Sequence, residues 1–189
     1  MLIYWNIPNA LSLARGLLVL PFILSIHDIF VHGCADNLVL LLLFSAILLS
    51  DVLDGFLARR LQCTSVLGAK LDVLSDTLYT ILSLATFAYF GVIPAWFVLV
   101  MLLKLAEFIV TSRIIRGRGG ADRPLLFDKL GKLSVSAVML LPGVFVLRCV
   151  FTDYKTVMVI AVHALTLPLA LSSVGRVRAA IQKARLPVG

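Results

Sequence analysis

Residues 51–76, DVLDGFLARRLQCTSVLGAKLDVLSD, contain four of the ten acidic residues in a chain of 189 residues. These are Asp51, Asp54, Asp72 and Asp76, and long apolar runs flank them on both sides. A carboxylate within an apolar helix is costly, so it normally has a partner and a function. The members of each pair are three or four residues apart and therefore share a helix face. Two facing helices would gather four carboxylates, whose charge one or two hard divalent cations would compensate.

The composition around this stretch is that of a membrane protein. Hydrophobic residues make up 61% of the chain and charged residues only 14%, more apolar surface than a soluble domain of this size can bury. We therefore predict one all-α integral membrane domain, 1–189, with six transmembrane helices. The expected helices are near 9–31, 38–60, 68–90, 93–115, 133–151 and 156–174. Residues 1–8 are expected to be an interfacial segment, with a helix start at Pro8 and Asn9, and 176–189 a basic tail at lipid headgroups.

The distribution of Lys and Arg predicts the orientation in the membrane. Thirteen of them fall in 59–70, 113–132 and 176–189, whereas Arg148 and Lys155 are the two on the opposite side. The positive-inside rule then places both termini and the aspartates on the cytoplasmic side of the cell membrane. The net charge of +7 is accordingly interpreted as topology and attraction to lipid, and no nucleic-acid partner is expected.

Other residues near the aspartates have properties suited to a ligand site. Gly55 and Gly68 would let a bulky ligand approach the backbone. Gly68 and Ala69 at a helix start could also face a phosphate, and Arg59 could neutralise an aspartate or a diphosphate. Elsewhere, Lys104 and Glu107 are three residues apart in the fourth predicted helix. Two interpretations of that pair stay open, a satisfied buried ion pair and a support for the cavity.

The pattern Asp51-x2-Asp54-Gly55-x2-Ala58-Arg59-x8-Gly68-x3-Asp72-x3-Asp76 resembles the signature of the CDP-alcohol phosphatidyltransferase family, with every fixed position filled. The resemblance implies six transmembrane helices around a cytoplasm-facing polar cavity, in a homodimer. It implies that the four aspartates hold Mg²⁺ or Mn²⁺ and that Asp76 is the general base. CDP-diacylglycerol would be the donor and CMP a product. The implied CDP-site residues are Gly55, Arg59, Ser65, Gly68 and Ala69, with Asn9 and Ser12 as weaker candidates.

Two further segments bear on the acceptor alcohol. Residues 107–113, EFIVTSR, and 128–134, DKLGKLS, resemble segments of bacterial phosphatidylglycerophosphate synthases. On that resemblance Arg113, Lys129 and Lys132 would bind the phosphate of glycerol 3-phosphate. Ala106 and Ser134 stand where that subfamily has basic residues. Inositol phosphate, serine and phosphatidylglycerol, the last as in cardiolipin synthesis, therefore remain alternative acceptors, and positive-inside charge remains the alternative role for each basic residue.

Two functions of other classes compete with phosphatidyl transfer. A divalent-cation transporter would use the aspartates as its binding site, but inverted repeats and polar residues in several helices would be expected, and the sequence shows neither. An inert membrane scaffold would not need the complete motif. The sequence therefore favours an enzyme.

Overall fold

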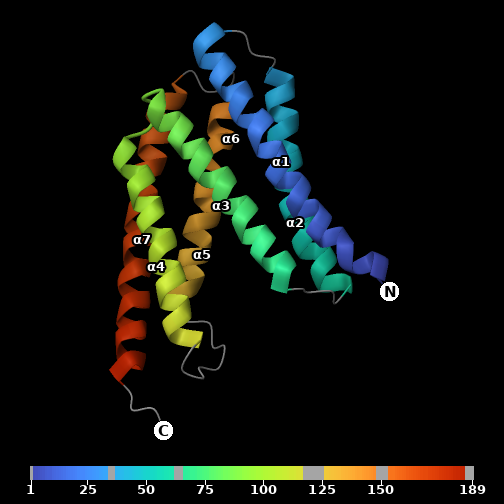
Figure 1. Cartoon of the computed structure of the whole chain (residues 1–189). Coiled ribbons are helices and arrows are strands. Elements are labelled where there is room, and N and C mark those ends of the chain that lie inside the picture. The colour runs from blue at the N-terminus through green and yellow to red at the C-terminus, as the bar shows by residue number, and fades with distance from the viewer. Residues whose placement is uncertain (1, 34–36, 62–65, 117–125, 148–152, 186–189) are drawn as a thin grey trace.

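All regular secondary structure in the computed structural model is helical within the residues it describes, which are 2–33, 37–61, 66–116, 126–147 and 153–185 (Figure 1). Within these ranges the side chains of 2–9, 54–55, 57–59, 61, 66–70, 112–116, 126–132 and 183–185 lie outside the description. The helices are α1 (Leu2–His32), α2 (Asn37–Leu61), α3 (Val66–Tyr89), α4 (Ala95–Arg116), α5 (Leu126–Met139), α6 (Leu141–Val146) and α7 (Tyr154–Arg185).

Each of the six predicted segments contains a helix, and the fifth is divided into α5 and α6. The division falls at Leu140, where Pro142 in the first turn of α6 has no N–H to continue the ladder from α5. Three helices in the described part are long and apolar enough to cross a membrane: Ala10–His32, Leu71–Tyr89 and Tyr154–Gln182. Shorter apolar helices cover Asn37–Leu53 and Leu133–Val146. The fold is therefore that of an all-helical membrane protein, and six crossings remain a prediction.

Two predicted helix boundaries are wrong. Helix α1 begins at Leu2, ahead of the start expected at Pro8, and α7 continues through Arg176 to Arg185. Prolines within helices are tolerated in membrane proteins, because neighbouring groups satisfy the freed backbone, and α7 likewise contains Pro168. The segment predicted as a basic tail is thus helical as far as residue 185.

The helices form two groups that meet at one end of the molecule. Helix α1 packs along α2 and α3, while α7 packs along α5 and α4, and α3 also contacts α4 and α5 (Figure 1). Where the groups meet, the Phe30 ring stacks on Phe90 at 4.3 Å and on Phe145 at 5.2 Å between centroids. Phe145 also contacts Phe87 and Tyr154, at 5.1 and 5.4 Å. These rings join four helices and close this end.

The turn from α3 to α4 lies at the same end. Gly91 adopts a left-handed φ of 66°. Its N–H donates to the carbonyl of Ala88 at 3.1 Å, and the Val92 N–H donates to the carbonyl of Phe87 at 2.8 Å. This is the Schellman arrangement, which satisfies the last carbonyls of a helix. Gly91 therefore ends α3 and turns the chain toward α4.

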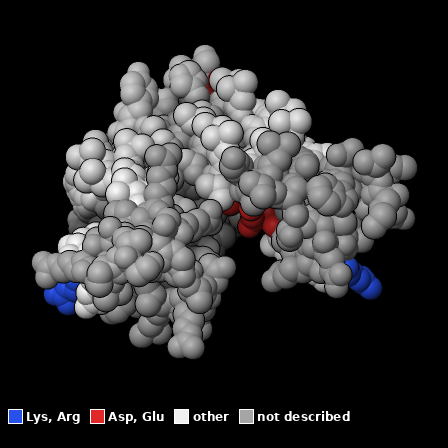
Figure 2. All heavy atoms as spheres, turned by 60° about the horizontal axis from the view of Figure 1, so that its bottom comes forward, with Lys and Arg blue, Asp and Glu red and all other residues white. Residues whose placement is uncertain are grey.

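The opposite end of the molecule is open. The start of α1 and the end of α7 lie there, together with the end of α2, the start of α3, the end of α4 and the start of α5 (Figure 1). Figure 2 shows acidic side chains recessed in a hollow on this face. The helix ends that lead into the predicted basic segments therefore lie at the hollow end, while its cytoplasmic orientation stays a prediction.

Candidate active site

Three of the four aspartates gather at the open end. Asp51 comes from α2, and Asp72 and Asp76 come from successive turns of α3. One carboxylate oxygen of each lies within 4.8 Å of the others. The predicted convergence is therefore confirmed for these three residues, which we call the aspartate cluster. Asp54 is in α2, and its side chain lies outside the description.

A buried arginine from α1 binds all three members of the cluster. Arg15 Nη1 lies 2.8 Å from Asp51 Oδ1 and 3.1 Å from Asp76 Oδ1, and Nη2 donates to Asp72 Oδ1. The Arg15 side chain is 0% exposed, whereas the carboxylates are 41, 27 and 42% exposed, in the same order. Solvent therefore reaches the carboxylates on a side that the guanidinium does not occupy. The four groups together carry a formal charge of minus two.

The contact between α1 and α3 brings Arg15 to the cluster. Ser75, which lies between Asp72 and Asp76, donates its hydroxyl to the carbonyl of Ser12 at 2.7 Å. A Cβ on Gly16 would lie 3.4 Å from the same hydroxyl, so the helices are close here. Ser12 is buried in this contact, and its part in cytidine binding remains a prediction.

Sequence analysis gave Arg15 no role, although a signal was present. Arg15 is the only Lys, Arg, Asp or Glu in residues 1–27, within a segment long enough to cross a membrane. A lone ionisable residue in such a segment is by default a functional candidate. The aspartates of residues 51–76 and this single arginine therefore carry complementary charges within apolar segments.

A cavity of about 470 Å³ extends from the cluster between α3, α4, α5 and α7. Asp72 and Asp76 line it from α3, while Lys104 lines it from α4 and Arg176 from α7. Carboxylates and basic side chains thus line the same cavity. The other lining residues are Val73, Thr77, Thr80, Ile81, Met101, Leu105, Phe108, Val135, Ser136 and Met139.

The two basic residues of the cavity are held by Glu107. Lys104 Nζ donates to Glu107 Oε2 and to Ser173 Oγ, both at 2.9 Å, and to Ser172 Oγ at 3.2 Å. Ser173 Oγ donates to the same Glu107 oxygen at 2.8 Å. Arg176 Nε lies 3.5 Å from Glu107 Oε1. Of the two interpretations left open for Lys104 and Glu107, the ion pair is observed, as part of a larger network between α4 and α7, and Lys104 also lines the cavity.

Arg176 is an exception to the predicted lipid-facing basic tail. Its side chain is buried, its Nη2 donates to Thr111 Oγ1 at 3.3 Å, and its guanidinium lies 4.7 Å from the centroid of Phe108. Because Glu107 pairs with both basic groups, Arg176 is held against α4, where it lines the cavity. The network of two cations and one carboxylate has a net formal charge of plus one.

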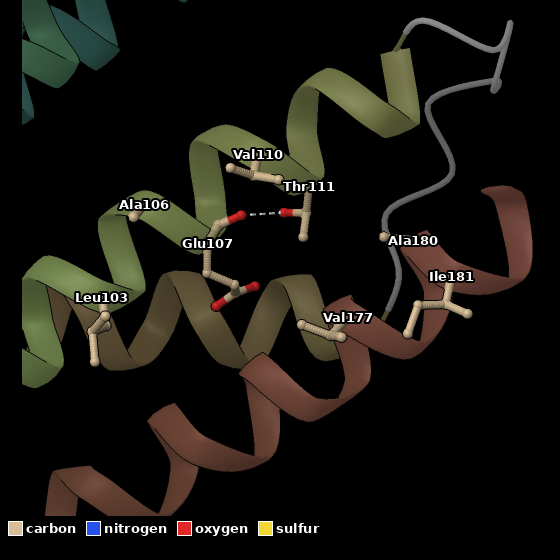
Figure 3. A pocket seen from close by; sticks show the side chains of 8 residues that line it. All are labelled: Leu103, Ala106, Glu107, Val110, Thr111, Val177, Ala180 and Ile181. Atoms are coloured by element: carbon tan, nitrogen blue, oxygen red, sulfur yellow. Dashed lines mark hydrogen bonds between the residues drawn. The ribbon is translucent and has the colours of Figure 1, made fainter.

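A second hollow lies between α4 and α7 and is almost entirely apolar (Figure 3). It has a volume of about 440 Å³. Its two polar residues are Glu107 and Thr111, and the Thr111 hydroxyl donates to the Glu107 carbonyl at 2.7 Å. The apolar residues are Leu103, Ala106, Val110, Val177, Ala180 and Ile181. This apolar groove and the cavity therefore share the α4–α7 network.

The remaining predicted site residues are only partly described. The backbones of Asn9, Gly55, Arg59, Gly68, Ala69, Arg113, Lys129 and Lys132 lie in helices, but their side chains do not belong to the described part. Ser65 falls between α2 and α3, outside the described residues. Their roles toward CDP and the acceptor stay predictions.

The aspartate cluster fits a hard divalent cation. Its donors are carboxylate oxygens, the ligands that Mg²⁺ and Mn²⁺ prefer. The charge of minus two that remains after Arg15 is counted matches one such ion. Asp51, Asp72 and Asp76 would hold it.

Known proteins with similar sequences belong to phospholipid biosynthesis. A "Putative cardiolipin synthase" of Mycobacterium tuberculosis is 32% identical over 76% of this chain and 66% of its own length. The CDP-diacylglycerol–glycerol-3-phosphate 3-phosphatidyltransferase of Aquifex aeolicus is 32% identical over 74% of this chain and 76% of its own. The "Cardiolipin synthase (CMP-forming)" of Streptomyces coelicolor is 38% identical over 71% of this chain and 61% of its own. Residues 5–172 match the model of the CDP-alcohol phosphatidyltransferases, and the chain therefore belongs to that family.

Proposed function

We propose that this protein transfers a phosphatidyl group from CDP-diacylglycerol to an alcohol and releases CMP, with glycerol 3-phosphate as the first-choice acceptor. One observation carries the proposal: Asp72 and Asp76 share a single cavity with Lys104 and Arg176. The transfer to a phosphorylated alcohol needs carboxylates that bind a metal ion and cations that bind the acceptor's phosphate. The cavity has the carboxylates at one wall and the cations at the other.

The reaction is a displacement at the phosphorus that carries the diacylglycerol. A bound Mg²⁺ or Mn²⁺ would neutralise the diphosphate and the departing CMP. Asp51, Asp72 and Asp76, with Asp54, would hold that ion. The acceptor hydroxyl oxygen forms the new bond to phosphorus while the bond to the CMP oxygen breaks, and its electron pair leaves with CMP. Asp76, which lines the cavity, accepts the hydroxyl proton.

The acceptor's phosphate is bound, in this proposal, by Lys104 and Arg176. The charge of plus one in their network suits an anionic ligand, and a guanidinium can bind a phosphate through two parallel hydrogen bonds. Arg113, at the end of α4, and Lys129 and Lys132, in the first turns of α5, stay proposed as further phosphate ligands, because these helix ends lie at the open face.

Phosphatidylglycerol is the second candidate acceptor, and the apolar groove favours it. The groove lies directly behind the α4–α7 network and is lined by apolar residues over almost its whole surface. An acyl chain of a lipid acceptor could lie there while its headgroup occupies the cavity. The relatives named cardiolipin synthases agree with such an acceptor.

An acceptor panel tests the reaction and separates the two acceptors. Purified protein in detergent receives CDP-diacylglycerol, Mn²⁺ and either glycerol 3-phosphate, phosphatidylglycerol, inositol phosphate or serine. CMP release is followed, and the lipid product is identified by mass spectrometry. The first-choice proposal expects CMP and phosphatidylglycerophosphate with glycerol 3-phosphate. No CMP with any acceptor would refute the enzyme proposal and favour a transporter or a scaffold.

A groove-filling variant sharpens the comparison. Ala106 is exposed in the apolar groove, so Ala106→Phe should fill it and leave the cavity unchanged. If phosphatidylglycerol is the acceptor, the variant should lose activity at least tenfold, while activity with glycerol 3-phosphate should persist. Ala170→Phe, at an exposed position of α7 outside the groove, is the control.

We further propose a homodimer in the cell membrane with both termini in the cytoplasm. The start of α1, the end of α7, the ends of α2 and α4 and the aspartate cluster lie toward one end of the molecule, which supports a single cytoplasmic face. Labelling of the native Cys34 and of a cysteine engineered at residue 186, in a variant that lacks Cys63 and Cys149, tests the orientation in intact cells. Crosslinking in native membranes tests the dimer.

A further inference from the structure

We propose that Arg15 is an exchangeable counter-ion: it holds the aspartate cluster together in the metal-free protein and competes with the divalent cation for it. The inference rests on the metal dependence proposed above. It assigns Arg15 a positioning role, with no contact to the reacting atoms.

The geometry places one guanidinium at the junction of three helices. Arg15 from α1 contacts an oxygen of Asp51 on α2 and an oxygen each of Asp72 and Asp76 on α3. Without a cation, three carboxylates within 4.8 Å of one another would repel and separate. Arg15 therefore keeps the ligands assembled before any metal arrives.

The same geometry makes Arg15 a competitor of the metal ion for the three carboxylates. The guanidinium is fully buried, while the carboxylates are 27 to 42% exposed, so an ion from solvent meets them on another side. Two cations would then share the same three carboxylates, and because the guanidinium is fully buried, solvent would screen their repulsion only in part. Coupling between two ligands is reciprocal. Metal binding must therefore weaken the Arg15 contacts, and Arg15 must weaken metal binding.

A permanent structural ion pair is the alternative. Removing one partner of such a pair leaves uncompensated buried charge and is strongly destabilising. The alternative differs from the proposal in one respect, because an exchangeable counter-ion can be replaced by the metal. The dependence of stability on metal therefore distinguishes the two.

The experiment compares wild-type protein with Arg15→Gln, Arg15→Lys and Arg178→Gln, all purified in detergent. Arg178 is exposed on α7, so its substitution removes one positive charge away from the cluster. Mn²⁺ binding is measured from the loss of the free-ion EPR signal. Thermal unfolding is measured in EDTA and in Mn²⁺. Neither readout requires substrate or turnover.

Arg15→Gln should bind Mn²⁺ at least tenfold more tightly than wild type and Arg178→Gln, which corresponds to about 1.4 kcal/mol. Its Tm should fall in EDTA and recover in Mn²⁺ more than that of wild type. Recovery of folded Arg15→Gln only from Mn²⁺-containing buffers would also support the proposal. Arg15→Lys, which keeps the charge, should bind Mn²⁺ within about threefold of wild type.

Three results would overturn the inference. The first is an unchanged or weaker Mn²⁺ affinity in Arg15→Gln. The second is failure of Arg15→Gln to fold both in Mn²⁺ and in EDTA. The third is Mn²⁺ binding by Arg15→Lys that is as tight as the binding expected of Arg15→Gln. If none of the four proteins binds Mn²⁺, the proposed metal dependence fails and this inference fails with it. Mn²⁺ binding by wild type with no gain in Arg15→Gln refutes the inference alone.

Discussion

Removal of the Lys104 ammonium is the substitution whose cost the structure specifies in most detail. In Lys104→Met the variant loses the contacts of Nζ to Glu107 Oε2 at 2.9 Å and to the hydroxyls of Ser173 and Ser172 at 2.9 and 3.2 Å. The methionine fills a similar volume, so the main change is electrostatic. Glu107 is then left partly uncompensated in a buried position.

The magnitude follows from what Glu107 retains. Loss of one partner from a buried ion pair costs about 3–5 kcal/mol. Glu107 keeps the Ser173 hydroxyl at 2.8 Å and Arg176 Nε at 3.5 Å, so we expect the lower bound, about 3 kcal/mol. For a chain of this size that corresponds to a fall in Tm of roughly 6–12 °C. The KM for an anionic acceptor should rise at least tenfold, because the cavity loses one of its two cations.

A double variant separates stability from acceptor binding. Lys104→Met with Glu107→Gln removes both charges, so most of the lost stability should return, while the acceptor KM should stay high. The assays are thermal unfolding in detergent and initial rates of CMP release against acceptor concentration. Lys104→Met with wild-type Tm and KM would refute the reasoning. A double variant with wild-type KM would show that Lys104 does not bind the acceptor.

Three further predictions concern single contacts. Arg176→Lys keeps the charge but loses the guanidinium geometry, so acceptor KM should rise with kcat nearly unchanged; a fall in kcat alone would argue against acceptor binding. A Cβ at position 143 would lie 2.6 Å from Phe44 Cζ, so Gly143→Ala should destabilise by about 1–3 kcal/mol, and an unchanged Tm would contradict this packing. Hydrogen bonds from Thr156 lower the pKa of Asp153. The Asp153 carboxylate thereby caps the start of α7. The stability that this cap gives to α7 should be present above the ordinary aspartate pKa and lost as pH falls through the lowered value. The stability of Asp153→Asn should not change with pH over that range.

The features predictable from the sequence are those that local spacing determines. The pair Asp72 and Asp76 shares a face because an α-helix has 3.6 residues per turn, and long apolar runs indicate helices whatever their partners. The turn at Gly91 follows from the conformational freedom of glycine. Each of these properties depends on residues close together in the chain.

The features that sequence analysis missed depend on how helices are rotated against one another. Arg15 faces the cluster only because Ser12 and Gly16 turn that face of α1 toward α3. Arg176 faces Glu107 only because α7 extends beyond the predicted boundary. A pattern was nevertheless present, since Lys104, Glu107 and Thr111 in α4 and Ser172, Ser173 and Arg176 in α7 recur at helical spacing. Polar residues at matching spacing in two apolar helices indicate that the helices pack together.

The rate of CMP release by Asp76→Asn tests the central claim most directly. The claim is that the carboxylate of Asp76 serves the transfer, both as a metal ligand and as the base for the acceptor hydroxyl. Initial rates are measured with CDP-diacylglycerol, Mn²⁺ and the best acceptor, with Asp153→Asn as the control at an exposed, distant carboxylate. The account predicts a loss of at least about 100-fold in Asp76→Asn, with folding intact, and no loss in the control. Retention of more than a tenth of the wild-type rate would contradict it.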